Sequence, residues 1–492
     1  TSAAQKFYGR ERQVQMKVRG ELERYRMSAG STADGRRMEV ASNVCSAEEA
    51  EAALANGCDG IGLFRTEMMF VGRDTAPTEE EQFKAYSGAA RAGKAAGNQF
   101  TLLRTFDAGG DKPVRFLPAP AKSDSSLGDR GILIYKEHSA VLQAQLRAML
   151  RASAEGPLRI MFPLVSTVEE LLWLREQVDA AKQLLAARGQ AFDPQIELGI
   201  MIELPDAVPN LAALAEHADF FSIGTNDLAQ YVFAQDRTRS KLDLRASVRH
   251  PEFLRLLREI AHQARQTKTW LGMCGEMAGD PINLPLLVGL NLDEISMGGD
   301  VLAIKARLSK LNTAACAELL EKAIGCSTIK EVDVLLAGFA AQGDASLRAQ
   351  QLVIAGSVSS TREDAIRELT DLFYIYGRTA EPDRLENAIW EREATYPTDM
   401  GFGFALPHCK TSAALQSSVA LLRPATPFLW SEESTVPVRL VIMLAMREEG
   451  AAHMQVLARL ARKLMDEEFR EGLLSCTDPS AALKLLIEAG VS

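Results

Sequence analysis

The sequence of 492 residues lacks several features that would assign it to a broad class of protein. No apolar run approaches the roughly 18 residues that a helix needs to cross a bilayer, and no signal-peptide pattern opens the chain. The seven cysteines are scattered, without a CxxC pair or the spacing of a disulfide framework. Reduced thiols are typical of intracellular proteins, so we predict a cytoplasmic protein.

The chain also lacks an excess of positive charge. Its formal net charge is -10, from 55 Lys and Arg against 65 Asp and Glu. This balance argues against nucleic acid or an anionic membrane as the main partner. Small anions remain possible ligands, because a few local arginines can override the sign of the whole chain.

Short apolar segments alternate with longer amphipathic stretches over the first two-thirds of the chain. The stretch STVEELLWLREQVDAAKQLLAARG, for example, has a Ser/Thr cap and apolar residues at helical spacing. Eight apolar strands separated by helices predict an α/β fold with a parallel sheet, and eight strands close a (β/α)₈ TIM barrel. An open doubly wound sheet is the main alternative, although no GxGxxG turn follows the first strand. The predicted strands are 38–44, 60–64, 100–106, 158–165, 196–204, 219–225, 269–275 and 294–298.

The pattern predicts two domains. A charged lead-in helix (1–35) precedes the barrel (36–341), and a linker (342–350) leads to a smaller α/β domain (351–492) with a mixed sheet flanked by helices. In this second domain we expect helices at 359–377, at 385–394 and from 453 onward, and strands at 417–423 and 436–444.

Polar residues that interrupt the apolar pattern fall at the carboxyl ends of the predicted barrel strands. In a barrel these ends meet at one mouth, where catalytic groups collect. Four arginines are expected there, and such a cluster would repel itself unless it held an anion with carboxylate or phosphate groups. These arginines are Arg65, Arg104, Arg130 and Arg237.

Three further strand-end residues suggest the chemistry. Glu203 and Asp227 are hard oxygen ligands one βα unit apart, and two carboxylates beside a phosphate suit Mg²⁺. Cys274 could present a thiol acid to an enolate carbon. Each residue also has a simpler interpretation: the arginines could form salt bridges, Glu203 could pair with one of them, and Cys274 could be an inert core thiol.

The barrel segments resemble the phosphoenolpyruvate-utilising enzymes, and in particular enzyme I of the bacterial sugar phosphotransferase system. The resemblance covers about residues 20–340 and is carried by GIGLFRTE, RTFDAGGDKP, LGDRGI, MIELP, FFSIGTNDLAQY with QDR, and MCGEMAGDP, in that order. It implies that Glu203 and Asp227 carry Mg²⁺ and that Cys274 protonates C3 of the enolate as pyruvate forms. It also implies a homodimer formed through the barrel. The residues that it implies for the phosphate and carboxylate of phosphoenolpyruvate are Arg65, Arg104, Arg130, Asn226 and Arg237.

The second domain resembles the IIA domain of the fructose–mannitol type in the same system. The matching segments are SSTREDAIRELTDLF, EREATYPTDMGFGFALPHCKT and HMQVLARLARKLMDEEFREGLL. In GFGFALPH the glycines allow close backbone approach, and Pro407 stiffens the turn that presents His408. The resemblance implies that His408 is the phosphoacceptor, that His453 is a second active-site histidine and that Arg392 assists them. It implies an HPr-like phosphocarrier and the IIB domain of a sugar permease as partners.

Together these resemblances predict a phosphoenolpyruvate–protein phosphotransferase, similar to the C-terminal part of a multiphosphoryl transfer protein. In enzyme I the first acceptor histidine lies on an N-terminal domain, and none of His138, His217, His250 and His262 has a similar setting. We therefore expect this acceptor to be supplied by an N-terminal portion. The alternative from another class is a regulatory protein that senses phosphoenolpyruvate without turning it over.

Overall fold

The computed structural model describes residues 8, 12, 19–20, 22–97, 99–107, 114–116, 130–234, 248–348, 352–415, 417–447, 453–476, 481–482 and 485–486, with backbone alone at 340–348 and 453–458. The chain divides into two units. One spans Arg19–Phe339 and the other includes Ala340–Ser492.

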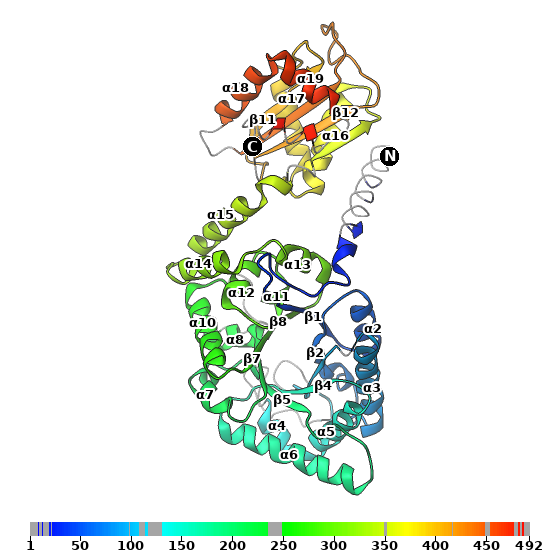
Figure 1. Ribbon diagram of the computed structural model, residues 1–492, viewed down its shortest axis with the longest axis vertical. Helices are drawn as coiled ribbons and strands as arrows, with labels where there is room; N and C mark the ends of the chain where they lie inside the picture. Colours follow the sequence, from blue (N-terminus) through cyan, green and yellow to red (C-terminus); the bar gives the residue numbers. More distant parts are fainter. Residues whose placement is uncertain are drawn as a thin grey trace. The chain divides into compact units, whose positions relative to one another are not determined.

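The first unit is a closed barrel of eight parallel strands (Figure 1). Each strand pairs with the next, and the last pairs with the first through Glu39–Ser42 and Glu294–Met297. All eight predicted strands are therefore confirmed, as is the barrel over the open sheet. The strands are β1 (Glu39–Val44), β2 (Ile61–Arg65), β3 (Thr101–Arg104), β4 (Leu158–Phe162), β5 (Glu197–Ile202), β6 (Phe220–Gly224), β7 (Trp270–Cys274) and β8 (Glu294–Met297).

Helices connect and surround these strands, and the sequence marks where several of them begin. Thr78 and Thr167 each form a capping box with a glutamate three residues later, which satisfies free backbone N–H groups at the helix start. The helices of this unit are η1 (Glu23–Tyr25), α2 (Ala47–Ala55), η2 (Thr66–Met69), α3 (Glu79–Ala95), α4 (Ile132–Glu137), α5 (Ser139–Ser153), α6 (Val168–Ala187), η3 (Pro205–Asn210), α7 (Leu211–Leu214), α8 (Thr225–Val232), α10 (Pro251–Gln266), α11 (Glu276–Gly279), α12 (Leu284–Leu290), α13 (Val301–Leu308), α14 (Thr313–Ile324) and α15 (Ile329–Arg348).

The interior of the barrel is filled by its own small cluster of side chains. Strand residues alternate between the interior and the surrounding helices. The interior cluster is separate from the large apolar core between strands and helices. Its buried members are Leu63, Leu102, Met161, Met201, Phe220 and Cys274. Cys274 therefore points inward at the carboxyl end of β7, as a barrel site requires.

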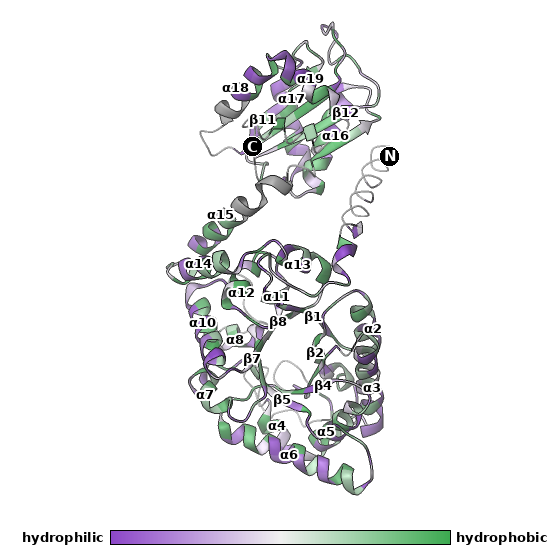
Figure 2. Cartoon of the chain, viewed as in Figure 1, coloured by the Kyte–Doolittle hydropathy of each residue, from purple (hydrophilic) through white to green (hydrophobic). Residues whose placement is uncertain are grey.

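The second unit contains a five-stranded mixed sheet, as predicted. Strand β13 is its centre: it runs antiparallel to β12 and parallel to both β10 and β11. Figure 2 shows hydrophobic residues concentrated along these strands. The strands are β9 (Val353–Ser357), β10 (Phe404–Ala405), β11 (His408–Thr411), β12 (Ser418–Pro424) and β13 (Leu440–Arg447), and the helices are α16 (Arg362–Ile375), α17 (Pro382–Glu393), α18 (His453–Leu464) and α19 (Glu467–Ser475).

For the connecting segments, the structure differs from some of the predictions made from the sequence. Seventeen of the 35 residues in the predicted lead-in helix lie outside the described residues. Of the others, Tyr8, Arg12, Arg19, Gly20 and Leu22 are helical, η1 follows, and residues 26–35 are not helical. Helix α15 extends through most of the stretch predicted as a linker, to Arg348. The sequence did not predict β9, β10 or β11.

No helix in the described part of the chain is long and apolar enough to cross a membrane.

The tight barrel interior generates the first prediction. A Cβ atom at Gly199 in β5 would lie 2.5 Å from the ring and the carbonyl oxygen of Phe220 on β6. We expect Gly199→Ala to lower the free energy of unfolding by about 1–3 kcal/mol, because the added methyl overpacks two strands. Gly338→Ala, at a helical position with open space, is the control and should stabilise by up to about 1 kcal/mol. Urea unfolding measures both, and equal effects would contradict the overpacking.

Candidate active site

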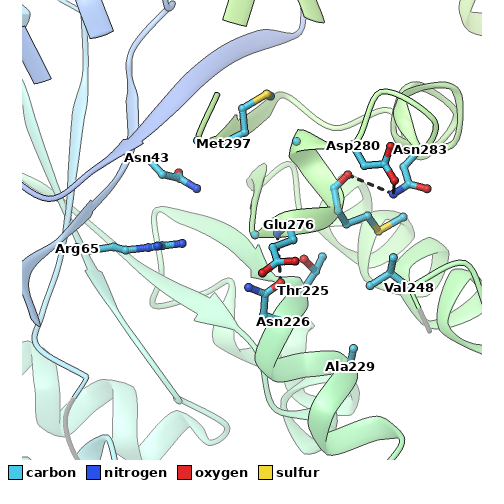
Figure 3. Close-up of a pocket in the computed structure, with 14 residues that line it drawn as sticks. Asn43, Arg65, Thr225, Asn226, Ala229, Val248, Glu276, Asp280, Asn283 and Met297 are labelled. Atoms are coloured by element: carbon cyan, nitrogen blue, oxygen red, sulfur yellow. Dashed lines mark hydrogen bonds between the residues drawn. The ribbon is translucent and has the colours of Figure 1, made fainter. Parts of the chain in front are cut away.

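A cavity of about 790 Å³ opens at the carboxyl ends of the barrel strands. Arg65, at the end of β2, extends into it toward Asn226 and Glu276, which come from the opposite side (Figure 3). The backbone N–H of Glu276 donates to Asn226 Oδ1 at 3.2 Å, which joins the starts of α11 and α8. Among the described residues, Arg65 and Asn226 are the predicted site residues that line this cavity.

Buried arginines and carboxylates form a continuous network at the same end of the barrel. Arg104 donates two hydrogen bonds to Glu67 Oε1, at 3.2 and 2.7 Å, and its Nη2 lies 3.7 Å from Asp107. Arg130 donates to both oxygens of Asp107, at 3.1 and 2.7 Å. The same guanidinium reaches both oxygens of Asp227 at the longer distances of 3.5 and 3.3 Å. Burial by itself would lower the pKa values of Arg104 and Arg130, but these carboxylates raise both.

This network corrects one step of the sequence argument. Clustered arginines were expected to need a bound anion, whereas Glu67, Asp107 and Asp227 already supply counter-charges within the protein. Arg104 and Arg130 are both buried. A ligand anion would therefore compete with carboxylates for these guanidinium groups. Arg237, the fourth predicted arginine, lies outside the described residues.

Glu203 directly follows β5 and is 1% exposed. Its Oε1 accepts a hydrogen bond of 2.9 Å from the backbone N–H of Leu164, whose φ of 54° is unusual for a branched side chain. A Cβ atom at Gly224 would lie 3.0 Å from Oε2, so the glycine leaves room for the carboxyl. Burial, and then the negative charges of Asp227 and Asp107, raise the pKa of Glu203 to about 8. The site therefore gathers more buried carboxyl groups than its two buried arginines can neutralise, and this excess favours a proton on Glu203.

Cys274 ends β7 and is buried. Ser222 Oγ on β6 donates to its sulfur at 3.7 Å. Burial raises the pKa of the Cys274 thiol to about 12, so it carries a proton at neutral pH. The next residue, Gly275, has a φ of 120°, and a Cβ there would lie 2.4 Å from Thr225 Oγ1. This close approach brings the end of β7 against the start of α8, where Asn226 and Asp227 lie.

The second unit holds a separate histidine site at the start of β11. His408 Nδ1 lies 2.8 Å from the carbonyl oxygen of Leu406, and Arg392 Nε lies 3.0 Å from His408 Nε2. Since the guanidinium can only donate, Nε2 must accept and the ring proton sits on Nδ1, where it is donated to Leu406. Arg392 is itself fixed by a 3.0 Å hydrogen bond from Nη1 to the carbonyl of Tyr396.

The other parts of the histidine motif have clear local roles. Gly401 and Gly403 have φ values of 71° and 87°, which glycine adopts without strain. His453 begins α18, but its side chain lies outside the described part of the chain.

Sequence reasoning identified the strand-end residues but missed several of their partners. It did not predict the pairing of Arg104 and Arg130 with Glu67 and Asp107. It also missed Asn43, a partly buried residue of β1 that lines the cavity. A polar residue inside an otherwise apolar strand was the available signal.

Comparisons with known proteins match both units. Residues 19–313 match the family of the PEP-utilising enzyme, PEP-binding domain, and residues 346–489 match the EIIA 2 family of the phosphoenolpyruvate-dependent sugar phosphotransferase system. The chain is 39% identical to multiphosphoryl transfer protein 2 of Escherichia coli over 98% of its own length and 58% of that relative. It is also 39% identical to the phosphoenolpyruvate-protein phosphotransferase of Staphylococcus carnosus, over 66% of this chain and 56% of that one.

Among solved structures, the IIA mannitol protein of Escherichia coli is 30% identical, with a TM-score of 0.25 over 28% of this chain and 96% of that one. The chain spans only 58% and 56% of the lengths of the two curated relatives named above.

The buried network generates the second prediction. Arg130→Met should lower the free energy of unfolding by about 3–5 kcal/mol, because it removes the guanidinium that is hydrogen-bonded to both Asp107 and Asp227 inside the barrel. The matched control is Arg258→Met, which breaks an exposed ion pair with Glu321 and should cost at most about 1 kcal/mol. Urea unfolding followed by tryptophan fluorescence compares the two. A cost for Arg130→Met no greater than the control's would contradict the structural role of the network.

Proposed function

Because the chain belongs to the phosphoenolpyruvate-utilising enzymes and carries a IIA-type domain, we propose that it is a phosphoenolpyruvate–protein phosphotransferase of a sugar phosphotransferase system. One observation carries this proposal: arginines, two buried carboxylates and a buried thiol meet at the carboxyl end of one barrel. These groups can bind a phosphorylated carboxylic acid and a divalent cation, and the thiol can protonate an enolate.

Arg65, Asn226 and the buried arginines bind the phosphate and carboxylate of phosphoenolpyruvate in this proposal, together with Arg237. The distances suggest how a paired arginine becomes available. Arg130 lies closer to Asp107 than to Asp227, at 2.7 against 3.3 Å for its nearest contacts. We infer that Arg130 stays on Asp107 and exchanges Asp227 for the substrate anion.

Glu203 and Asp227 are the residues that would carry Mg²⁺. Their chemistry fits this ion, because both are buried carboxylates whose mutual repulsion a cation would relieve. No group of three or more metal-ligating side chains occurs among the described residues, and Mg²⁺ commonly takes only one or two carboxylates beside phosphate and water. When bound, the ion would neutralise charge on the phosphate.

Cys274 is the proposed acid. As the phosphoryl group leaves phosphoenolpyruvate for an acceptor histidine, an enolate remains. Transfer of the thiol proton to C3 of that enolate gives pyruvate and a thiolate. The raised pKa of Cys274 supports this role, because the sulfur carries its proton before the reaction.

His408 is the proposed phosphoacceptor of the IIA-type domain. Its Nε2 lone pair, once Arg392 has released it, can attack a phosphoryl group, while the hydrogen bond from Nδ1 to Leu406 fixes the reactive tautomer. Arg392 can then contact the bound phosphoryl oxygens, and His453 is proposed as a second active-site histidine. The phosphoryl donor is proposed to be an HPr-like carrier and the acceptor a IIB domain of a sugar permease. We further propose a cytoplasmic homodimer formed through the barrel.

Calorimetric titration with phosphoenolpyruvate tests the barrel site. Binding should occur with Mg²⁺ and be lost with a chelator. In a separate experiment with added pyruvate and Mg²⁺, the methyl protons of pyruvate should exchange with D₂O, as followed by NMR, because the Cys274 thiolate can remove a proton from C3. Failure to bind would contradict the proposal, whereas binding without exchange would favour a sensor that does not turn over its ligand.

Glu203→Gln gives the third prediction. The amide still accepts from Leu164 but cannot ionise. Because the raised pKa of about 8 makes the folded protein keep a proton on Glu203 that the unfolded chain releases at neutral pH, the metal-free variant should gain about 0.5–2 kcal/mol of stability. Binding of phosphoenolpyruvate in Mg²⁺ should fall at least about 10-fold, because one oxygen ligand loses its charge. Urea unfolding and calorimetry measure the two effects. Unchanged Mg²⁺-dependent binding would refute Glu203 as a ligand.

His408 and Arg392 give the fourth prediction. His408→Ala should abolish acid-labile phosphate incorporation from phospho-HPr into the second unit. Arg392→Met should slow incorporation by about 10- to 100-fold, because one charge-assisted contact worth about 1.5–3 kcal/mol is lost. Arg384→Met, an exposed arginine that pairs with Glu381, is the control and should label normally. Labelling of His408→Ala at the unaltered rate would place the acceptor elsewhere.

A further inference from the structure

A carboxyl group lies inside the barrel without a counter-charge in contact. Glu294 begins β8, is 1% exposed and belongs to the inward-facing set of strand residues. Its Oε1 atom and the Oγ atom of Ser296 have no hydrogen-bond partner in the described part of the chain. Buried polar atoms without partners cost stability, so this pair calls for a functional explanation.

Two glycines make room for this carboxyl. A Cβ atom at Gly62 in β2 would lie 2.0 Å from Glu294 Oε1 and 2.8 Å from Ser296 Oγ. A Cβ at Gly272 in β7 would lie 2.4 Å from Glu294 Oε2. The carboxyl therefore occupies the space of two absent side chains, and Ser296 Oγ borders the same space.

The strand register places this pair next to Cys274. In the β7–β8 ladder Gly272 is opposite Glu294, and Cys274 is opposite Ser296. Residues two apart on a strand face the same side. Glu294 thus lies one interior layer from Cys274, toward the amino ends of the strands, and Ser296 lies on the neighbouring strand at the level of the thiol.

The surrounding charges favour a protonated Glu294. Burial, and then the nearby Glu39 at the amino end of the barrel, raise its pKa well above the ordinary value, against the opposing effects of the Ser296 side chain, the Met273 backbone and the charge of Arg159. Glu39 is partly exposed and also has a raised pKa, chiefly from burial. Glu39 is thus a second carboxyl group that lies nearer to solvent than the carboxylic acid of Glu294.

We propose that Glu294 supplies the proton that restores Cys274 after each turnover, through the hydroxyl of Ser296. This inference rests on the proposed function. Ser296 Oγ makes no hydrogen bond to the Cys274 sulfur among the described contacts, so the relay requires the Ser296 side chain to turn toward the thiolate after Cys274 has given its proton to C3. The thiolate then takes a proton from Ser296 Oγ as the Ser296 oxygen takes one from the Glu294 carboxylic acid. The Glu294 carboxylate regains its proton from water at the amino end of the barrel, past Glu39. Glu294 acts through Cys274 and is therefore a positioning residue for the proton, not a catalytic residue.

The test is the exchange of pyruvate methyl protons in D₂O, measured by NMR on the full chain with Mg²⁺. Exchange requires the proton taken up by Cys274 to be replaced by solvent deuterium before it returns to C3. Glu294→Gln keeps the shape but cannot release a proton in this way, and Ser296→Ala removes the connecting hydroxyl. Both should slow exchange by about 10-fold or more, while calorimetry shows phosphoenolpyruvate affinity within about 2-fold of the unaltered chain.

Two control variants separate the possible outcomes. Glu197→Gln, at an exposed carboxylate beside Arg159, should exchange normally, and Cys274→Ala should not exchange. Should Glu294→Gln fail to fold, Ser296→Ala decides, because it removes only an unpartnered hydroxyl. Normal exchange in a folded Ser296→Ala variant, or in Glu294→Gln, would overturn the inference and leave the proposed function standing. No exchange in the unaltered chain would overturn both.

Discussion

Asp107 is shared by two buried guanidinium groups, and the carboxyl end of the barrel is organised around this sharing. Arg130 donates two hydrogen bonds to it, and Arg104 lies within ion-pair distance. Through these arginines the carboxylate connects η2, β3, the segment before α4 and the start of α8. Such alternation of charge makes it possible to bury so many ionised groups, because each arginine has more than one counter-charge.

This arrangement also fixes what a ligand must provide. A buried arginine that is already paired exchanges one counter-anion for another more readily than it acquires an additional one, since its charge remains compensated throughout the exchange. An anion can replace one carboxylate only if the displaced carboxylate finds another cation. Under the proposed function, the binding of the substrate anion and of a divalent cation would therefore be coupled by electrostatics alone.

The sequence predicted the fold of the first unit well, because each barrel strand is a short apolar run followed by polar residues. The second sheet was harder to predict. Strands β10 and β11 are only two and four residues long, and they form because β13 offers both of them one edge. Which site residues pair with each other was the hardest feature to predict. Asp107 and Arg130 are 23 positions apart, and no local pattern indicates that their side chains meet.

Glu294 shows a constraint of another kind, which concerns how this barrel can vary. Its carboxyl fills the space above Gly62 and Gly272, on two other strands. A larger residue at either glycine fits only if Glu294 is also replaced by a smaller one. A smaller residue at position 294 leaves a void unless a glycine is also replaced by a larger one. Single substitutions at these three positions are therefore each unfavourable, while concerted ones are permitted. Mutagenesis of one position at a time would therefore yield few tolerated substitutions at these three positions. Libraries that vary the three positions together would yield more.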